Sequence, residues 1–352
     1  DALSYLDGKK LEGGVDQNTP GDGLIPTNPS FALGTATQFD DHLSETMFYA
    51  RELSNAEVFE NDLYLQQKWG QLTTDQKAPG GVHYGLALWL DANDTNTLFQ
   101  DSCSSANTPA NTDYSPVTCW HDKSGLGNHV EGVSNFIGGT YTLNAMNGRP
   151  AIASTFDRGF LGSLPQFSSG AQEHTIFVVA KSNSNGGSFV AIGNSGETSK
   201  VAHLHNQGSE TLRYSTWGYY LDKTVPDKHR SQHVYTGSYD GTTGYSWHNG
   251  KYLGSEIMPL DLAAAPTVGI GRMGIPGFSL LGKIAEVVIY NRQLSATERQ
   301  AVEAYLAQKW LDEPYYLSCA EAQAAGETMN AYFTIDADGY NGPAAPAQTF
   351  CN

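Results

Sequence analysis

An aromatic-rich stretch has the residue types that best suit the binding of a sugar. Residues 213–222 read RYSTWGYYLD and place Trp217, Tyr219 and Tyr220 close together. The CH faces of pyranose rings stack on Trp and Tyr rings, while nearby polar side chains bind the hydroxyl groups. The stretch therefore predicts a glycan-binding site, with a core position for Trp217 as the alternative.

Acidic and amide side chains gather in turns and have the chemistry of cation ligands. Asp91, Asn93 and Asp94 lie in one predicted turn, and Asp122 and Asn128 lie in another. Clustered oxygen ligands suit Ca²⁺, but Asp and Asn also cap the backbone of ordinary turns. These five residues form the candidate Ca²⁺ site, and a turn without a cation is the alternative.

Two pairs of histidines have spacings that could serve a transition metal. His203 and His205 would lie on one face of a strand, and His229 and His233 have the spacing of one helical turn. Imidazole nitrogens bind zinc and copper, but no acid or Cys stands at ligand spacing beside them. Surface histidines on polar strands are the favoured interpretation.

Motifs of glycan-cleaving and hydrolytic enzymes are absent from the sequence. Retaining glycoside hydrolases need two carboxylates about 5 Å apart, which a strand with the pattern E-x-D-x-x-E would supply, and no such strand occurs. An R-x-E-x-R strand with a Q-x-H partner, as in polysaccharide lyases, is missing, and so are GxSxG and HExxH. We expect a protein that is not an enzyme.

The charge balance excludes two classes of partner. The chain has 352 residues and a formal net charge of −17 at pH 7. Without a basic stripe it would bind neither nucleic acid nor an anionic membrane surface. It also lacks an apolar run of about 20 residues, so no membrane insertion is expected. Abundant Gly, Ser, Thr, Asn and Tyr are typical of a turn-rich β protein.

Four cysteines form two local pairs. Cys103 and Cys119 bracket one loop, and Cys319 and Cys351 bracket the C-terminal segment. Neither pair has the C-x-x-C spacing of zinc and redox motifs. An even count of local pairs indicates two disulfides and an oxidising compartment, with four buried thiols as the alternative. We therefore expect a secreted or cell-surface protein.

Short apolar strands separated by turns make up the middle of the chain. Runs such as HTIFVVAKS (174–182), HVYTGSYD (233–240) and KIAEVVIY (283–290) are rich in β-branched and aromatic residues. An Asn-Gly pair at 249–250 is a strong hairpin signal. The pattern predicts an all-β antiparallel sandwich of about a dozen strands, closed by one short helix.

That helix is predicted within residues 291–310. Ser295 and Glu298 form a capping box at its start. Apolar side chains then follow at helical spacing, namely Val302, Tyr305, Leu306 and Trp310. The stripe indicates a helix that packs on the sandwich and carries no chemistry.

The same helix pattern occurs a second time. Residues 50–69 (ARELSNAEVFENDLYLQQKW) align without a gap with residues 291–310 (NRQLSATERQAVEAYLAQKW). The strand-like runs before them, ETMFY at 45–49 and EVVIY at 286–290, also match. The two copies indicate a long-period internal repeat.

Two motifs resemble those of a known family. LALWLDANDTNTL (86–98) and CWHDKSGLGNHV (119–130), with the closing strand and helix, resemble concanavalin A-like, laminin G-like jelly-roll domains of bacterial secreted proteins. The matching motif residues are Trp89, Asp91, Ala92, Trp120, Asp122, Ser124, Gly125, Gly127 and Asn128. The resemblance implies a complete unit at 84–312, a linker at 71–83, and the C-terminal part of a preceding unit at 1–70.

The C-terminal segment 313–352 resembles the start of a fibrinogen-like domain. The residues that carry this resemblance are Cys319, Tyr332, Ile335, Asp336, Asp338, Gly339, Pro343 and Cys351. The loop DADGYNG (336–342) is a second candidate for Ca²⁺, for which an ordinary turn is favoured. We expect a fragment of a longer protein, although residues 1–70 could instead complete a sandwich with another chain or form a smaller subdomain.

These observations lead to one expected function and two alternatives. We expect a non-catalytic carbohydrate-binding or adhesion module that binds a glycan or cell-surface polysaccharide. Other domains or chains of a larger extracellular protein would be its further partners. The first alternative is a structural or interaction module, such as a spacer or filament component, without a sugar site. The second is an accessory part of a polysaccharide-degrading enzyme.

Overall fold

The computed structural model describes most of the chain between residues 78 and 311. The gaps in this range are 106, 134–136, 156–157, 194–195, 209, 226–231 and 274–277, and the other described residues are 5–6, 9–10, 47, 49, 61, 315–316, 318–324, 331–335 and 347–351. The chain divides into two compact units, Asp1–Gln76 and Lys77–Asn352. In the first, β1 (Tyr5–Leu6) pairs with β2 (Lys9–Lys10). The predicted repeat at 45–69 and the loop 336–342 lie outside the described residues, apart from Met47, Tyr49 and Asn61.

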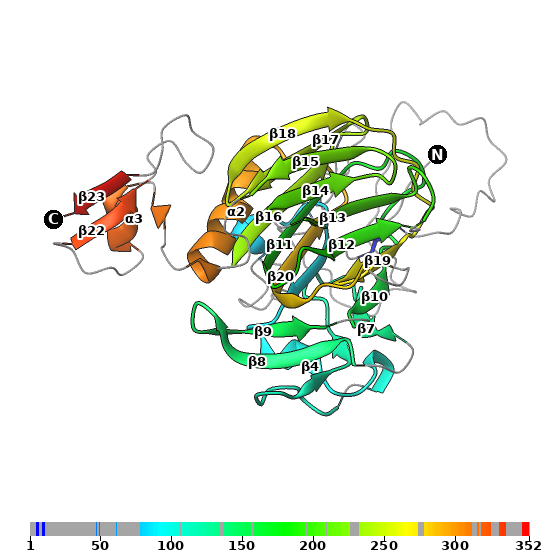
Figure 1. Cartoon of the computed structure of the whole chain (residues 1–352), viewed down its shortest axis with the longest axis horizontal. Helices are drawn as coiled ribbons and strands as arrows, with labels where there is room; N and C mark the ends of the chain where they lie inside the picture. The colour runs from blue at the N-terminus through cyan, green and yellow to red at the C-terminus, as the bar shows by residue number, and fades with distance from the viewer. Residues whose placement is uncertain are drawn as a thin grey trace, which may run out of the picture. The chain divides into compact units, whose positions relative to one another are not determined.

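Two nine-stranded antiparallel sheets form a sandwich (Figure 1). Sheet I runs in the order β18 (Lys251–Ile257), β17 (Thr243–His248), β16 (His233–Tyr239), β11 (His174–Ser182), β20 (Gly282–Tyr290), β9 (Arg149–Ser154), β8 (Gly139–Met146) and β5 (Pro116–Val117), and β3 (Leu86–Asp91) also pairs with β20. Sheet II runs in the order β15 (Tyr220–Thr224), β14 (Thr211–Ser215), β13 (Val201–Gln207), β12 (Gly186–Gly193), β19 (Thr267–Ile270), β10 (Phe160–Ser163), β7 (Val130–Gly132), β6 (Cys119–Trp120) and β4 (Leu98–Phe99).

The hydrophobic core lies between the sheets, and a second cluster lies on the far side of sheet I. Ile176 and Val178 of β11 enter the core between the sheets, whereas Phe177 and Val179 enter the second cluster. Successive side chains of a strand point to opposite faces, so this strand is apolar throughout because both of its faces are covered. The prediction of an all-β antiparallel sandwich is confirmed. The structure has more strands than predicted because short strands such as β4 to β7 pair within turn-rich sequence.

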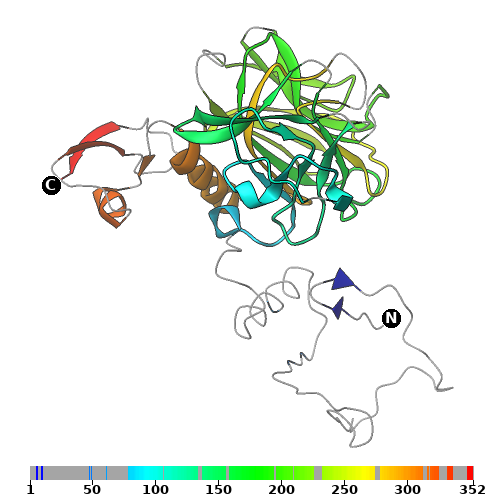
Figure 2. The same cartoon turned by 90° about the horizontal axis from the view of Figure 1, so that it is seen from below.

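The closing helix α2 (Ala296–Trp310) covers the outer side of sheet I (Figure 2). The predicted capping box is present, because the Ser295 hydroxyl accepts from the Glu298 N–H and the Glu298 carboxylate accepts from the Ser295 N–H. Val302, Leu306 and Trp310 are buried in the second cluster as predicted. The helix thus begins where its sequence signal places it and buries the predicted stripe.

The end of the predicted linker belongs to the sandwich. Residues Pro79–Gly81 form the 3₁₀ helix η1, and Ala78 and Val82 are buried in the second cluster with α2. Gly80 has a φ of 62°, and an added Cβ would lie 2.5 Å from the carbonyl carbon of Ala301. Only Gly allows this close approach of the backbone to α2. The linker prediction for 71–83 is therefore wrong from Ala78 onward.

The remaining elements are short. The 3₁₀ helices η2 (Thr95–Thr97) and η3 (Cys103–Ser105) lie in the loops around β4. In the C-terminal segment, β21 (Tyr315–Tyr316) pairs in parallel with β22 (Ala331–Ile335), which pairs antiparallel with β23 (Ala347–Cys351), and α3 (Cys319–Ala324) follows β21. In the described parts of the chain, no helix has the length and apolar character needed to cross a membrane.

Candidate functional site

Three neighbouring strands of sheet II carry two rows of polar and aromatic side chains on one face. The register pairs His205 with Arg213 and Arg213 with Asp222, and in the next row it pairs His203 with Ser215 and Ser215 with Tyr220. Directly paired residues share a face of a sheet. The alternating residues Leu204, Leu212, Tyr214 and Leu221 enter the core between the sheets, so the two rows lie on the outer side. We call these six residues the β13–β15 face.

An ion pair and an aromatic ring dominate the exposed part of this face. Arg213 donates from Nε to Asp222 Oδ1 at 2.5 Å and from Nη2 to Asp222 Oδ2 at 2.6 Å. Its guanidinium carbon also lies 4.2 Å from the centroid of the Tyr220 ring. The hydrogen bond from Arg213 lowers the pKa of Asp222. The pair therefore stays charged and holds Tyr220, which is 47% exposed, in a defined position.

The turn between β14 and β15 presents the other predicted aromatic residues. Tyr219 is 43% exposed, and its carbonyl accepts from the Thr216 N–H at 3.2 Å. Trp217 is half-buried, and its ring meets Phe278 edge-on with centroids 5.8 Å apart. Trp217 packs beside Val201 in a small cluster on the outer side of sheet II. The structure thus brings the three residues together, with Tyr219 and Tyr220 open to solvent and Trp217 partly used for packing.

His203 and His205 form a buried stack beneath this region. Their rings are 3.9 Å apart and nearly parallel, and the two residues are 1% and 4% exposed. Burial, together with the charges of His205 and Arg213, holds the pKa of His203 well below its usual value, so the ring is neutral. Within the described residues, neither ring nitrogen of His203 has a hydrogen-bond partner. Both rings share one strand face as predicted, but the interpretation of them as surface histidines is wrong, because both are buried.

The second predicted histidine pair does not join the first. His229 lies outside the described residues. His233 belongs to sheet I, where its ring is 4.6 Å from the ring of His248. Among described residues, one group of three potential metal ligands occurs, and it consists of Cys103, Cys119 and His121. The two cysteines of this group are bonded to each other, so their sulfurs are not available as thiolate ligands.

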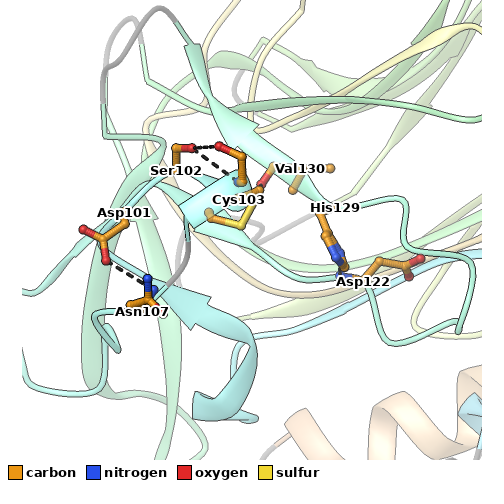
Figure 3. Close-up of a disulfide and its surroundings, with 9 residues drawn as sticks. Asp101, Ser102, Cys103, Asn107, Asp122, His129 and Val130 are labelled. Carbon is orange, nitrogen blue, oxygen red and sulfur yellow. Dashed lines mark hydrogen bonds between the residues drawn. A yellow bond between two sulfur atoms is a disulfide. The ribbon is translucent and has the colours of Figure 1, made fainter.

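Both predicted disulfides are present. Cys103 is bonded to Cys119, and Cys319 is bonded to Cys351. Figure 3 shows the first, with Val130 beside Cys103 and with His129 and Asp122 on the adjoining segment. It ties a loop rich in Ser, Asn, Thr and Pro to β6 of sheet II. A disulfide of this kind stabilises by about 3 kcal/mol, mainly by restricting the unfolded chain.

The second candidate Ca²⁺ turn is held by hydrogen bonds within the protein. Asp122 Oδ1 accepts from the N–H groups of Trp89 and Ser124, both at 2.9 Å. Asp122 Oδ2 accepts from the Ser124 hydroxyl at 2.6 Å and from the Asn128 N–H at 3.0 Å. Asn128 Nδ2 donates to the Ala87 carbonyl at 2.8 Å. These contacts tie the turn to β3, which is the structural role of an Asp in a turn.

The first candidate Ca²⁺ turn contacts lysines. Lys123 Nζ lies 3.1 Å from Asp91 Oδ2 and 2.9 Å from Asp94 Oδ2, and Lys309 Nζ lies 2.8 Å from the same Asp91 oxygen. The Asn93 N–H donates to Asp91 Oδ1 at 3.0 Å. Ammonium groups thus provide the positive charge that a cation would supply. The turn interpretation accounts for all five residues, and Ca²⁺ binding by them stays a prediction.

Asp91 also borders a buried ionic network that the sequence did not reveal. Glu286 of β20 is 0% exposed. Its carboxylate accepts from Lys309 Nζ at 2.7 Å, from Trp89 Nε1 at 2.7 Å and from Trp310 Nε1 at 2.6 Å. Burial, followed by the charge of Asp91, raises the pKa of Glu286. The network joins β3, β20 and α2, so its role is to hold the closing helix.

Known proteins offer a limited comparison. No family model and no curated protein matches the chain. Similar solved structures include the CBM40 of Ruminococcus gnavus IT-sialidase bound to α2,3-sialyllactose, at 20% identity over 36% of this chain and 80% of that chain, with a TM-score of 0.32. Trypanosoma rangeli sialidase in complex with sialic acid matches at 12% identity over 71% of this chain and 40% of its own, with a TM-score of 0.42.

A third similar structure is the binding domain of botulinum neurotoxin serotype D. It matches at 12% identity over 64% of this chain and 52% of its own length, with a TM-score of 0.42. Values this low assign no family to the chain. Its function must therefore be argued from the β13–β15 face.

Proposed function

We propose that the protein is a non-catalytic carbohydrate-binding module and that the β13–β15 face is its site. The observation that carries this proposal is the exposed Tyr220 ring, fixed by Arg213 and flanked by Asp222. A pyranose presents an apolar CH face and a rim of hydroxyl groups. An immobilised aromatic ring beside a charged pair of donors and acceptors complements both features.

Rigidity supports the proposal as much as chemistry does. The two rows of side chains stand on three hydrogen-bonded strands, and Asp222 holds Arg213 through two parallel contacts. Ordering a free Arg and a free Tyr on binding would cost conformational entropy, whereas here most of that ordering is already present in the folded protein. The exposed Tyr219 and the half-buried Trp217 lie next to this face, in the β14–β15 turn.

The setting proposed for this module is extracellular. Two disulfides are formed, and structural disulfides persist in oxidising compartments. An adhesive role, with a cell-surface polysaccharide as ligand and further domains of a longer protein as partners, is part of the same proposal. A spacer or interaction module without a sugar site is the alternative that the following experiment separates from it.

Replacing Tyr220 with alanine is expected to weaken glycan binding at least about fivefold, because loss of a stacked aromatic ring costs on the order of 1–3 kcal/mol and about 1.4 kcal/mol corresponds to a factor of ten. A glycan array, run with and without Ca²⁺, first identifies a ligand for the unaltered protein. Calorimetry then compares the two proteins with that ligand. The alanine variant is expected to keep its thermal stability because the ring is half exposed.

Tyr252→Ala is the matched control for this measurement. Tyr252 is 50% exposed, like Tyr220, but it lies on β18 at the edge of sheet I. Its loss is expected to leave glycan affinity unchanged. The proposal fails if the array shows no ligand, or if both alanine variants bind as well as the unaltered protein.

A further inference from the structure

We infer that the β13–β15 face selects uncharged glycans over glycans that carry carboxylate or sulfate groups. This inference rests on the proposed function and adds the class of ligand to it. An Arg on a sugar-binding face ordinarily favours an anionic sugar, because its planar fork of N–H groups matches a carboxylate or sulfate. The contacts of Arg213 remove that preference.

Asp222 already occupies the fork of Arg213. Both carboxylate oxygens accept from the guanidinium, one from Nε and one from Nη2. A ligand carboxylate would have to displace Asp222 or approach it closely, and Asp222 stays ionised because the hydrogen bond from Arg213 lowers its pKa. Two carboxylates at one guanidinium repel each other. A sugar hydroxyl group has no such conflict, since it can donate to Asp222 and accept from the remaining N–H groups of Arg213.

Among the described residues, Lys200, Lys223 and His203 do not offer an alternative anchor for an anion on this face. Lys200, which lies next to the β14–β15 turn because the Ser199 N–H donates to the Trp217 carbonyl, is paired with Asp261. Lys223 follows Asp222 on β15 and therefore points to the opposite face of the strand. Its Nζ lies close to the backbone of Gly254 in β18, since a Cβ added there would be 2.8 Å from it. His203 is held neutral by burial.

The charge of the whole chain acts in the same direction. A net charge of −17 creates a negative potential that slows the approach of anions at low salt. A module that selects anionic glycans would need a local positive patch to overcome this potential. On the described residues of the β13–β15 face, the charged pair of Arg213 and Asp222 sums to zero.

The test compares matched oligosaccharides that differ only in one anionic group. Each neutral oligosaccharide on the array is paired with its sialylated, uronic-acid and sulfated counterparts, and the binding pairs are measured by calorimetry at low and high NaCl. The unaltered protein is expected to bind the neutral member at least about tenfold more tightly. Its affinity for the neutral member is expected to be insensitive to salt, because no ligand charge is screened.

Asp222→Asn tests the cause. This variant frees the Arg213 charge, and we expect the anionic member of each pair to gain at least about tenfold relative to the neutral member. Asp261→Asn, which frees Lys200 instead, is the control and is expected to leave the ratio unchanged. Circular dichroism checks that both variants are folded.

Three outcomes are decisive. Preference for neutral ligands that shifts only in Asp222→Asn supports the inference. Tighter binding of the anionic members by the unaltered protein, or an unchanged ratio in folded Asp222→Asn, overturns the inference while the proposed glycan function stands. Absence of binding to every member overturns the proposed function and the inference with it.

Discussion

Replacing Lys309 with methionine is expected to lower the free energy of unfolding by about 3–5 kcal/mol. Lys309 Nζ lies between two buried carboxylates, 2.7 Å from Glu286 and 2.8 Å from Asp91. Methionine fills a similar volume, but it leaves two acids close together without their shared cation. Asp91 keeps Lys123 at 3.1 Å, whereas Glu286 becomes a buried carboxylate without a cation, and removing one partner of a buried ion pair in this way is costly. Chemical denaturation measures the difference.

Two further variants separate this effect from a general loss of a lysine. Lys200→Met removes the exposed pair with Asp261 and is expected to cost less than about 1 kcal/mol. Glu286→Gln removes one acid and leaves Lys309 paired with Asp91, so it is expected to cost less than Lys309→Met. A Lys309→Met protein as stable as the Lys200→Met protein would contradict the network as described.

Acid is expected to begin to destabilise the protein near pH 6.5, above the pH at which an ordinary carboxylate takes up a proton. His174 is fully buried, and burial lowers its pKa to about 4. In the unfolded chain the same ring has a pKa of about 6.5. Between pH 6.5 and 4 the unfolded state therefore binds a proton on this ring that the folded state does not bind. The stability that is present above pH 6.5 is lost as the pH falls toward 4. His174 alone accounts for about 3 kcal/mol over that window.

Other groups modify the acid response in known directions. His203 and His248 act in the same sense as His174, because burial lowers the pKa of His203 and lowers the pKa of His248 to about 3. Glu286 acts in the opposite sense, because burial raises its pKa and the folded protein takes up that proton more readily. Its protonation thus offsets part of the loss as the pH falls.

Urea unfolding at several pH values between 7 and 5 measures the first part of this loss. Below that range, paired carboxylates such as Glu298, whose pKa is lowered to about 2 chiefly by its hydrogen bond from Arg292, add their own acid sensitivity. His174→Gln removes the titrating ring and offers an amide near the Tyr214 hydroxyl, which is 2.6 Å from His174 Nε2. The variant is expected to show a shallower pH dependence. Equal slopes for both proteins would refute the role given to His174.

Several residues of the buried network around Glu286 also occur in the earlier copy of the internal repeat. Glu286, Tyr305, Lys309 and Trp310 all recur at the matching positions Glu45, Tyr64, Lys68 and Trp69. The helix packed on a sheet is predicted from its capping box and apolar stripe. The sequence also contains the network members that β20 and α2 supply, among them Tyr305, whose hydroxyl donates to Glu286 Oε1 at 3.0 Å. It does not reveal that Trp89 and Asp91 complete the network, because this depends on the register between β3 and β20. The register between two strands that are distant in sequence is set by tertiary packing, and the hydrophobic periodicity of each strand alone does not specify it.

In the candidate site too, the residue types were predicted from the sequence, whereas the pairing of the strands was not. The aromatic residues of 213–222 pointed to sugar chemistry, and the two tyrosines are exposed. Arg213 and Asp222 were in the same stretch, but only the hairpin register of β14 and β15 makes them partners. Their equal distance from the turn was the signal that could have found them. The Ca²⁺ prediction was based on acidic and amide residues that are close in sequence. It could not include Lys309 of α2, which contacts Asp91 but is distant from it in sequence.

NMR mapping of a bound sugar locates the glycan site on the protein. The protein, labelled with ¹⁵N, is titrated with the tightest neutral glycan from the array, and amide shifts are followed residue by residue. We predict that the largest changes fall on β13, β14, β15 and the turn that carries Trp217 and Tyr219. Shifts centred on another surface, such as β8 and β9 of sheet I, would contradict the assignment of the glycan site to the β13–β15 face.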